Sequence, residues 1–228
     1  MNKDRQHVLN QFLAQCVRVF QNLGFEVVTG PEIVTEADNF DLLNMPSTHP
    51  ARDVQDTFWL KDGRLLRTHT SAMQVPAMHQ RKAPAKIVVP GRCFRNEATD
   101  ASHETTFYQL EGFAIDKNIA MADLIGTLKY FIAEIFGKEI KIKYYPHHYP
   151  FVEPGMDVSI YWKNKWLEIL GSGMIHPKVL ENMGLDPNEW QGFAFGMGID
   201  RRQFFKTGFT FFFGRGGDYQ SENCRRFS

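Results

Sequence analysis

Arginine and carboxylate side chains at two-residue spacing make one stretch of the chain a candidate polar site. Arg95 and Glu97 follow an apolar run, and residues two apart on a strand point to the same side of the sheet. Phe107, Gln109 and Glu111 alternate in the same way after a polar loop. If the two segments pair antiparallel, these five side chains form one patch. An Arg-x-Glu pair alone is more often part of a solvated sheet face with cross-strand ion pairs.

A second candidate site lies where a glycine-rich segment runs into an arginine. Gly192, Gly196 and Gly198 fall in a predicted strand that leads into a helix, and a residue without a Cβ lets another group approach the backbone. Arg201 stands at the start of that helix, where the helix end already attracts anions. The segment is not a dinucleotide fingerprint, because the third glycine is replaced and no βαβ unit surrounds it. A phosphate site built with an arginine is the chemistry that remains.

Helices and strands must position these residues. Apolar residues at offsets of three and four predict one amphipathic helix over 8–20, stopped by Gly24, and another over 120–136, stopped by Gly137. The tripeptide Lys61-Asp62-Gly63 predicts a hairpin turn. Short runs rich in β-branched and aromatic residues predict strands at about 57–60, 64–67, 86–94, 107–115, 139–145, 157–162, 166–171 and 191–197.

The order of these elements predicts the fold class. Strands that follow one another through hairpins, without regular βαβ alternation, favour an α+β fold with an antiparallel sheet flanked by helices. No repeat or linker interrupts residues 1–201, so we interpret them as one domain. Residues 202–228 are rich in phenylalanine and then polar, with no usable period, and are left unassigned.

Composition excludes several classes of protein. With 228 residues, 43% hydrophobic and 23% charged, the chain is neither disordered, collagen-like nor a coiled coil. Lys+Arg 26 against Asp+Glu 26 gives a net charge of zero, so any nucleic-acid contact must be local or come from a partner. Three widely spaced cysteines argue against disulfides and CxxC zinc sites, and no apolar run reaches the roughly 20 residues of a membrane span. We therefore expect a cytoplasmic protein without membrane contact.

The arginine segments become informative in their order along the chain. Leu23–Pro31, the Arg95 strand pair and Gly196–Arg201 resemble motifs 1, 2 and 3 of class II aminoacyl-tRNA synthetases. The chain resembles most the catalytic core of bacterial phenylalanine–tRNA ligase α chains, over about residues 7–201. The further runs that carry this resemblance are Asn39–Asn44, His49–Arg52, Asp56–Trp59, Leu66–Ser71, Tyr149–Pro154 and Gly173–Pro177.

The resemblance implies an activity and an ATP site. Such enzymes activate phenylalanine with ATP to an adenylate and transfer it to tRNA(Phe), which needs positioning and charge neutralisation rather than a protein nucleophile. By position, Arg95 and Arg201 are the implied catalytic residues, on the α- and γ-phosphates. Phe107 resembles the aromatic that stacks on adenine, with Glu97 and Gly198 completing the ATP-binding set.

The resemblance also implies an amino-acid pocket and a metal ligand. Glu168 matches a carboxylate that holds Mg²⁺ near the triphosphate, although a strand carboxylate is more often merely solvated. Tyr149 departs from the family, which commonly has phenylalanine there, and a hydroxyl pointing into the pocket would need a partner. The implied polar end consists of His69, Ser71, Gln109 and Glu111, and the apolar slot of Tyr149, Phe151, Val152 and Ala194.

Partners follow from the same resemblance. We expect a β chain in an α2β2 heterotetramer, with the motif 1 segment and its preceding helix at a dimer interface. The family usually carries an amino-terminal helical arm that contacts tRNA, whereas the resemblance here begins at the catalytic core, so we expect the chain to act without that arm. The segment after Arg201 departs from the family pattern. Two alternatives remain. The first is a binding or regulatory subunit, or a truncated product, that keeps the fold without turnover. The second is a synthetase for another amino acid. The aromatic slot disfavours the latter.

Overall fold

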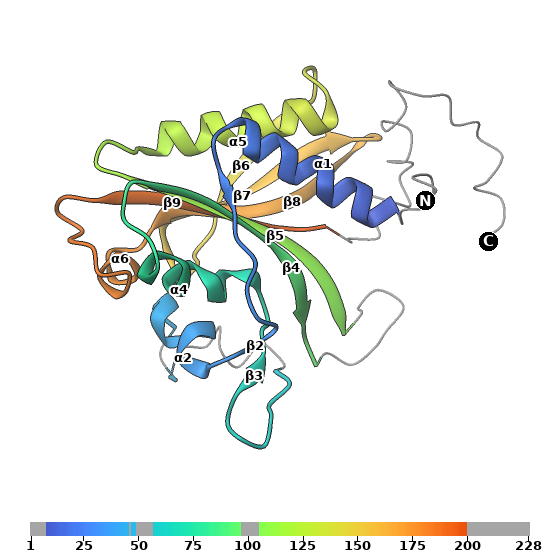
Figure 1. Cartoon of the computed structure of the whole chain (residues 1–228). Coiled ribbons are helices and arrows are strands. Elements are labelled where there is room, and N and C mark those ends of the chain that lie inside the picture. Colours follow the sequence, from blue (N-terminus) through green and yellow to red (C-terminus); the bar gives the residue numbers. More distant parts are fainter. Residues whose placement is uncertain (1–7, 46, 49–56, 97–104, 200–228) are drawn as a thin grey trace, which may run out of the picture.

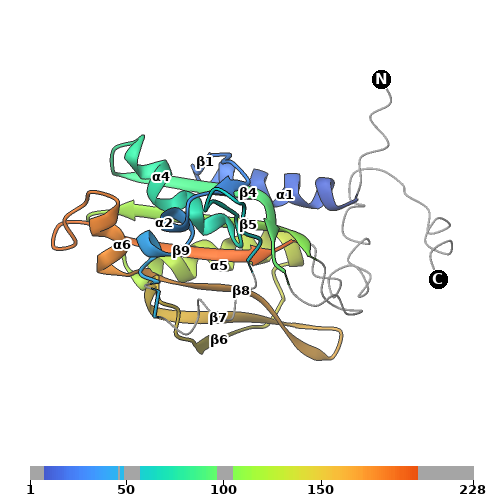
Figure 2. The same cartoon turned by 90° about the horizontal axis from the view of Figure 1, so that it is seen from below.

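A seven-stranded mixed sheet forms the centre of the computed structural model, which describes residues 8–45, 47–48, 57–96 and 105–199. Neighbouring strands are antiparallel except β1 and β4, which are parallel, so the predicted antiparallel sheet has one parallel pair at its edge. Figure 2 shows β9, β8, β7 and β6 following one another across the sheet. In spatial order the strands are β1 (Glu26–Val27), β4 (Ala85–Phe94), β5 (Thr106–Asp116), β9 (Gln191–Gly198), β8 (Lys165–Ile175), β7 (Val152–Trp162) and β6 (Ile142–Pro146).

Two long helices cover one face of this sheet (Figure 1). They are α1 (Val8–Asn22) and α5 (Met121–Phe136), as the apolar periodicity predicted, and Gly24 and Gly137 follow them with φ of 83° and 100°. Their rings join the sheet in one core, where Phe20 stacks on Phe131 at 4.6 Å and on Phe195 at 4.8 Å between centroids. This face is therefore fully occupied by packing.

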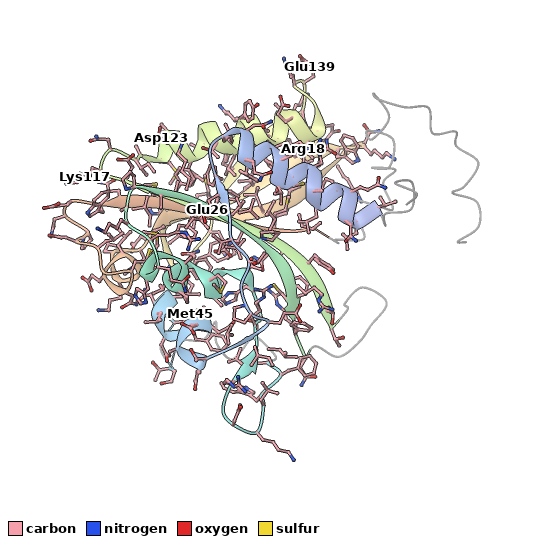
Figure 3. The ribbon with its side chains drawn as sticks, viewed as in Figure 1. Arg18, Glu26, Met45, Lys117, Asp123 and Glu139 are labelled. Carbon is pink, nitrogen blue, oxygen red and sulfur yellow. The ribbon has the colours of Figure 1, made fainter. Side chains whose placement is uncertain are left out.

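Short helices gather on the opposite face, where they enclose a second apolar core. Figure 3 shows Met45 of this layer on the other side of the sheet from Arg18 of α1 and Asp123 of α5. The sequence analysis did not predict these helices, because segments of three to six residues carry no readable period. They are α2 (Glu36–Asn39), η1 (Asp41–Leu43), η2 (Thr70–Met73), α4 (Gln74–His79) and α6 (Pro177–Asn182), with η marking 3₁₀ turns.

The hairpin before η2 corrects two of the predicted strands. The run at 57–60 contributes only an isolated bridge between Trp59 and Leu65. The run at 64–67 shortens to β3 (Leu65–Leu66), which pairs with β2 (Ile33–Val34) in a separate two-stranded sheet. The predicted turn is present, since the amide of Leu60 donates to the carbonyl of Arg64 at 2.8 Å.

The remaining predicted strands are present, with shifted ends. The strand predicted at 139–145 begins only at Ile142. The segments at 157–162 and 166–171 are the parts of the longer strands β7 and β8 that lie next to the turn between them. Within the described ranges, no helix is both long and apolar enough to cross a membrane. Glu97, Arg201 and the unassigned segment 202–228 lie outside the described residues.

Candidate active site

The β4–β5 pair brings the predicted patch together. Cys93 lies opposite Phe107 and Gly91 opposite Gln109, so the site residues of both strands share the face that carries the short helices. Just beyond β4, the amide of Arg95 donates to the Thr105 carbonyl at 3.0 Å and continues the register. The Arg95 guanidinium lies 4.8 Å from the centre of the Phe107 ring, a cation–π distance. The predicted juxtaposition is confirmed for the described members of the patch.

Glu111 is the buried carboxylate of the site. Only 3% of the residue is exposed, and it accepts hydrogen bonds from the Ser71 hydroxyl and the Gln74 amide, both on the η2–α4 segment. Burial raises the pKa of the Glu111 carboxyl to about 7, and the two hydrogen bonds lower it in part. Sequence reasoning missed Gln74. Its only signal is the three-residue spacing from Ser71, which becomes readable once this segment is known to be a helical turn.

His69 lies beside this cluster as a neutral ring. It is 5% exposed, and both of its ring nitrogens are buried. Burial lowers the pKa of His69 to about 3, helped by the charges of Arg95 and Arg67 and opposed weakly by the backbone of Asn39. A neutral imidazole offers one donor and one acceptor, so His69 can bind a polar ligand group of either kind.

Backbone anchors hold the segment that carries His69. The Arg67 guanidinium crosses the sheet edge over Gly91, where an added Cβ would lie 1.9 Å from it, and its Nε donates to the Arg92 carbonyl at 2.8 Å. The Asn39 side chain exchanges hydrogen bonds with Thr68 at 2.9 and 3.2 Å. These contacts tie the loop to both β4 and α2, and they fix the direction of the following side chains.

Two glycines form a floor between the polar and aromatic parts of the site. Strand register places Glu111, Gly196, Gly171 and Asp157 in one row across β5, β9, β8 and β7, and directly paired residues share a face. A Cβ added to Gly196 would lie 2.8 Å from Nε2 of Gln109. Neighbouring strands are about 4.8 Å apart, and the strip formed by these two glycines carries the Gln109 amide over Gly196 and the Tyr149 hydroxyl over Gly171.

The aromatic part of the site stands over the second glycine. A Cβ added to Gly171 would lie 2.6 Å from the hydroxyl oxygen of Tyr149, so only glycine admits that ring. Tyr149 stacks on Phe151 with 5.5 Å between ring centroids and a 25° interplanar angle. Val152 and Ala194 are buried in the same apolar core against which both rings pack. All four predicted slot residues thus lie on the site face or its bordering loop.

The Tyr149 hydroxyl has a partner that the sequence analysis did not identify. It donates to Oδ1 of Asp157 at 2.6 Å, and Oδ2 of the same carboxylate lies 2.9 Å from Nδ1 of His147. No spacing rule links residues 149 and 157, which meet only because β7 folds back beside the Tyr149 loop. The hydroxyl therefore points to the sheet rather than lacking a partner.

The proposed metal ligand occupies the outer part of the same face. Glu168 on β8 lies opposite Ser159 of β7, and a register shift between Val158 and Ser159 keeps it on the side of Asp157. Its side chain is exposed. No group of three potential metal ligands occurs among the described residues, so these residues alone supply at most a partial coordination shell there.

Similarity to known proteins decides the family. The model for the class II core domain (F) of tRNA synthetases matches residues 1–210. The chain belongs to this family. The chain also resembles the crystal structure of pyrrolysyl-tRNA synthetase from Desulfitobacterium hafniense, with a TM-score of 0.68 and 17% identity, covering 88% of this chain and 70% of that one. At that identity the likeness concerns the fold, and it confirms the predicted class II α+β architecture.

The most informative relatives are phenylalanine–tRNA ligase alpha subunits. The subunit from Synechocystis sp. is 46% identical over 197 residues, covering 86% of this chain and 60% of the relative. The one from Lachnoclostridium phytofermentans is 48% identical over 201 residues, covering 83% of this chain and 59% of the relative. The chain thus spans about 60% of the length of these relatives. The resemblance drawn from the sequence motifs is confirmed.

Proposed function

We propose that the chain is the catalytic core of a phenylalanine–tRNA ligase α chain, which activates phenylalanine with ATP and transfers it to tRNA(Phe). The observation that carries this proposal is the glycine strip of Gly196 and Gly171. A buried carboxylate cluster at Glu111 lies at one end and the aromatic pair of Tyr149 and Phe151 at the other. An amino acid with an aromatic side chain has one polar end and one aromatic end, which match these two groups in kind, and the named relatives are phenylalanine–tRNA ligase subunits.

The polar residues would hold the amino-acid end of the substrate. An ammonium group beside Glu111 stabilises the ionised carboxylate, which burial otherwise disfavours, so binding and ionisation support each other. Gln109 and Ser71 can accept or donate further hydrogen bonds, and His69 supplies a neutral donor or acceptor. The substrate ring would then meet Tyr149 and Phe151, with Val152 and Ala194 closing the apolar slot.

ATP would bind along β4 and β5, next to this strip. The substrate carboxylate attacks the α-phosphorus, the bond from that phosphorus to the bridging oxygen breaks, and pyrophosphate leaves. Arg95 would neutralise the charge that develops on the α-phosphate, and Phe107 would stack on adenine. Glu97, Gly198 and Arg201 would complete the ATP site, with Arg201 on the γ-phosphate. A tRNA ribose hydroxyl then attacks the acyl carbon, and AMP leaves.

A magnesium ion fits the exposed carboxylate of Glu168. Mg²⁺ in nucleotide sites is commonly bound through one or two carboxylates, with phosphate and water oxygens supplying the rest, so a single carboxylate on the site face suits it. When bound, such an ion supplies positive charge to the phosphates. Glu168 itself would hold the ion and keep it on the site face of β8.

We further propose the partners expected from the sequence. A β chain would complete an α2β2 heterotetramer, and α1 with the segment around β1 would form a dimer interface. Residues 1–201 would act as one domain in the cytoplasm. With a net charge of zero the chain offers no global field for RNA, so contacts to tRNA would come largely from the β chain.

The test is phenylalanine-dependent exchange of pyrophosphate into ATP, with and without a β chain. We expect exchange in the complex and tRNA binding that strengthens when the β chain is added, measured by fluorescence anisotropy across a salt series. Binding of phenylalanine without exchange in either sample would instead indicate a regulatory subunit. Tight, steeply salt-dependent tRNA binding by the lone chain would contradict the proposed division of labour.

A further inference from the structure

Asp157 connects an aromatic wall of the slot to the central sheet. We propose that it is a positioning residue for phenylalanine recognition, which holds the Tyr149 ring in place through the ring hydroxyl. The inference rests on the proposed function and adds to it a residue that does not itself touch the substrate.

The contact is short and well enclosed. The Tyr149 hydroxyl donates to Oδ1 of Asp157 at 2.6 Å, the length of a hydrogen bond to an ionised acceptor. The Asp157 side chain is 14% exposed, so water competes little for that oxygen. The second oxygen lies 2.9 Å from Nδ1 of His147, whose ring stacks on Tyr149 at 4.4 Å. Ring, carboxylate and imidazole therefore hold one another in a closed set of contacts.

The floor beneath the ring explains why an anchor is needed. Gly171 lies between Asp157 and Gly196 in the strand row and presents no side chain to the Tyr149 ring. A ring over bare backbone can tilt or slide, because contact is lost only gradually as it moves. The hydroxyl bond at the far edge restricts that motion and sets the ring plane that faces Phe151. A substrate ring that meets the exposed edge of this pair would contact that plane directly.

Substitutions can separate anchoring from general stability. Asp157→Leu removes the acceptor, whereas Asp157→Asn keeps an oxygen that accepts from the hydroxyl. In the complex with the β chain, we expect Asp157→Leu to raise KM for phenylalanine about tenfold, the size expected for a lost charged hydrogen bond, with KM for ATP unchanged. Asp157→Asn should restore most of the affinity.

The decisive measurement is a double-mutant cycle with Tyr149→Phe. In that background no hydroxyl is present, so Asp157→Leu should change KM for phenylalanine by less than about twofold. Tyr130→Phe, at an exposed position of α5, is the matched control and should leave the effect of Asp157→Leu at its full size. If Asp157→Leu does not fold, Tyr149→Phe is compared with wild type instead, because it removes the same hydroxyl without altering the carboxylate, and it should raise KM for phenylalanine about tenfold.

The outcomes distinguish this inference from the proposed function. Absence of phenylalanine binding and exchange in the wild-type complex would overturn both. A second outcome would overturn only the anchoring role. In it the wild-type complex is active, but Asp157→Leu raises KM for phenylalanine equally whether residue 149 is tyrosine or phenylalanine. Equal increases of KM for ATP and phenylalanine would also overturn it, because a purely structural defect affects both substrates.

Discussion

Replacing Glu111 with glutamine should change how the stability of the protein depends on pH. The pKa of this carboxyl rises from the ordinary 4.5 to about 7 in the folded chain, chiefly through burial. Between these values the folded state binds the proton more tightly than the unfolded state, so wild-type stability falls as pH increases from 4.5 to 7. At about 1.4 kcal/mol per pH unit, this loss amounts to about 3 kcal/mol, and it is complete above pH 7.

The assay is urea unfolding of wild type and Glu111→Gln at pH 5 and pH 8. The substitution also disturbs the hydrogen bonds from Ser71 and Gln74, which costs about 1 to 3 kcal/mol. Since that cost is similar at both pH values, the informative quantity is how the difference in unfolding free energy between the two proteins changes with pH. We expect the variant to gain about 3 kcal/mol relative to wild type on going from pH 5 to pH 8.

A control separates this carboxyl from general titration. Glu134→Gln removes a carboxylate from an exposed position of α5 and should leave the pH dependence of stability as it is in wild type. Equal pH dependence in wild type and Glu111→Gln would refute the reasoning, because it would mean that Glu111 is solvated or already paired with a positive charge. The same linkage predicts proton release when the ammonium of phenylalanine binds near pH 6, measurable by calorimetry in buffers of different ionisation enthalpy.

Three further substitutions test the site in the same exchange assay. Arg95→Ala should cost about 2 to 4 kcal/mol in adenylate formation with unchanged thermal stability, and an unfolded variant whose folded fraction stays active would contradict the phosphate role. Gly196→Ala should lower kcat/KM for phenylalanine about tenfold, because its Cβ would displace the Gln109 amide that lies 2.8 Å away, whereas Gly126→Ala, with open space around it, should be neutral. Ala194→Gly should admit para-substituted phenylalanines, and unchanged discrimination would place this residue outside the slot.

Local physical rules were sufficient for the long elements and for the first half of the site. Apolar spacing predicted α1 and α5, since a helix that covers a sheet must bury one stripe along its length. The period of two on β4 and β5 placed Arg95, Phe107 and Glu111 on one side, because the pleat alone decides which face a strand residue takes. The order of the motifs then pointed to the class II family, which the family model confirmed.

Other parts of the site depend on contacts between segments far apart in the chain. Gln74 reaches Glu111 only because a 3₁₀ turn and a six-residue helix pack on the sheet, and such short helices are stabilised by tertiary contacts rather than by their own sequence. The pairing of Tyr149 with Asp157 depends on the registers of β7, β8 and β9 together. A shift of one residue in any of them would move the floor glycines and the carboxylate to the other face. Residue types and their order along the chain thus pointed to the candidate chemistry. How these residues meet follows from strand register and from the docking of short helices, both of which depend on the packing of the whole core.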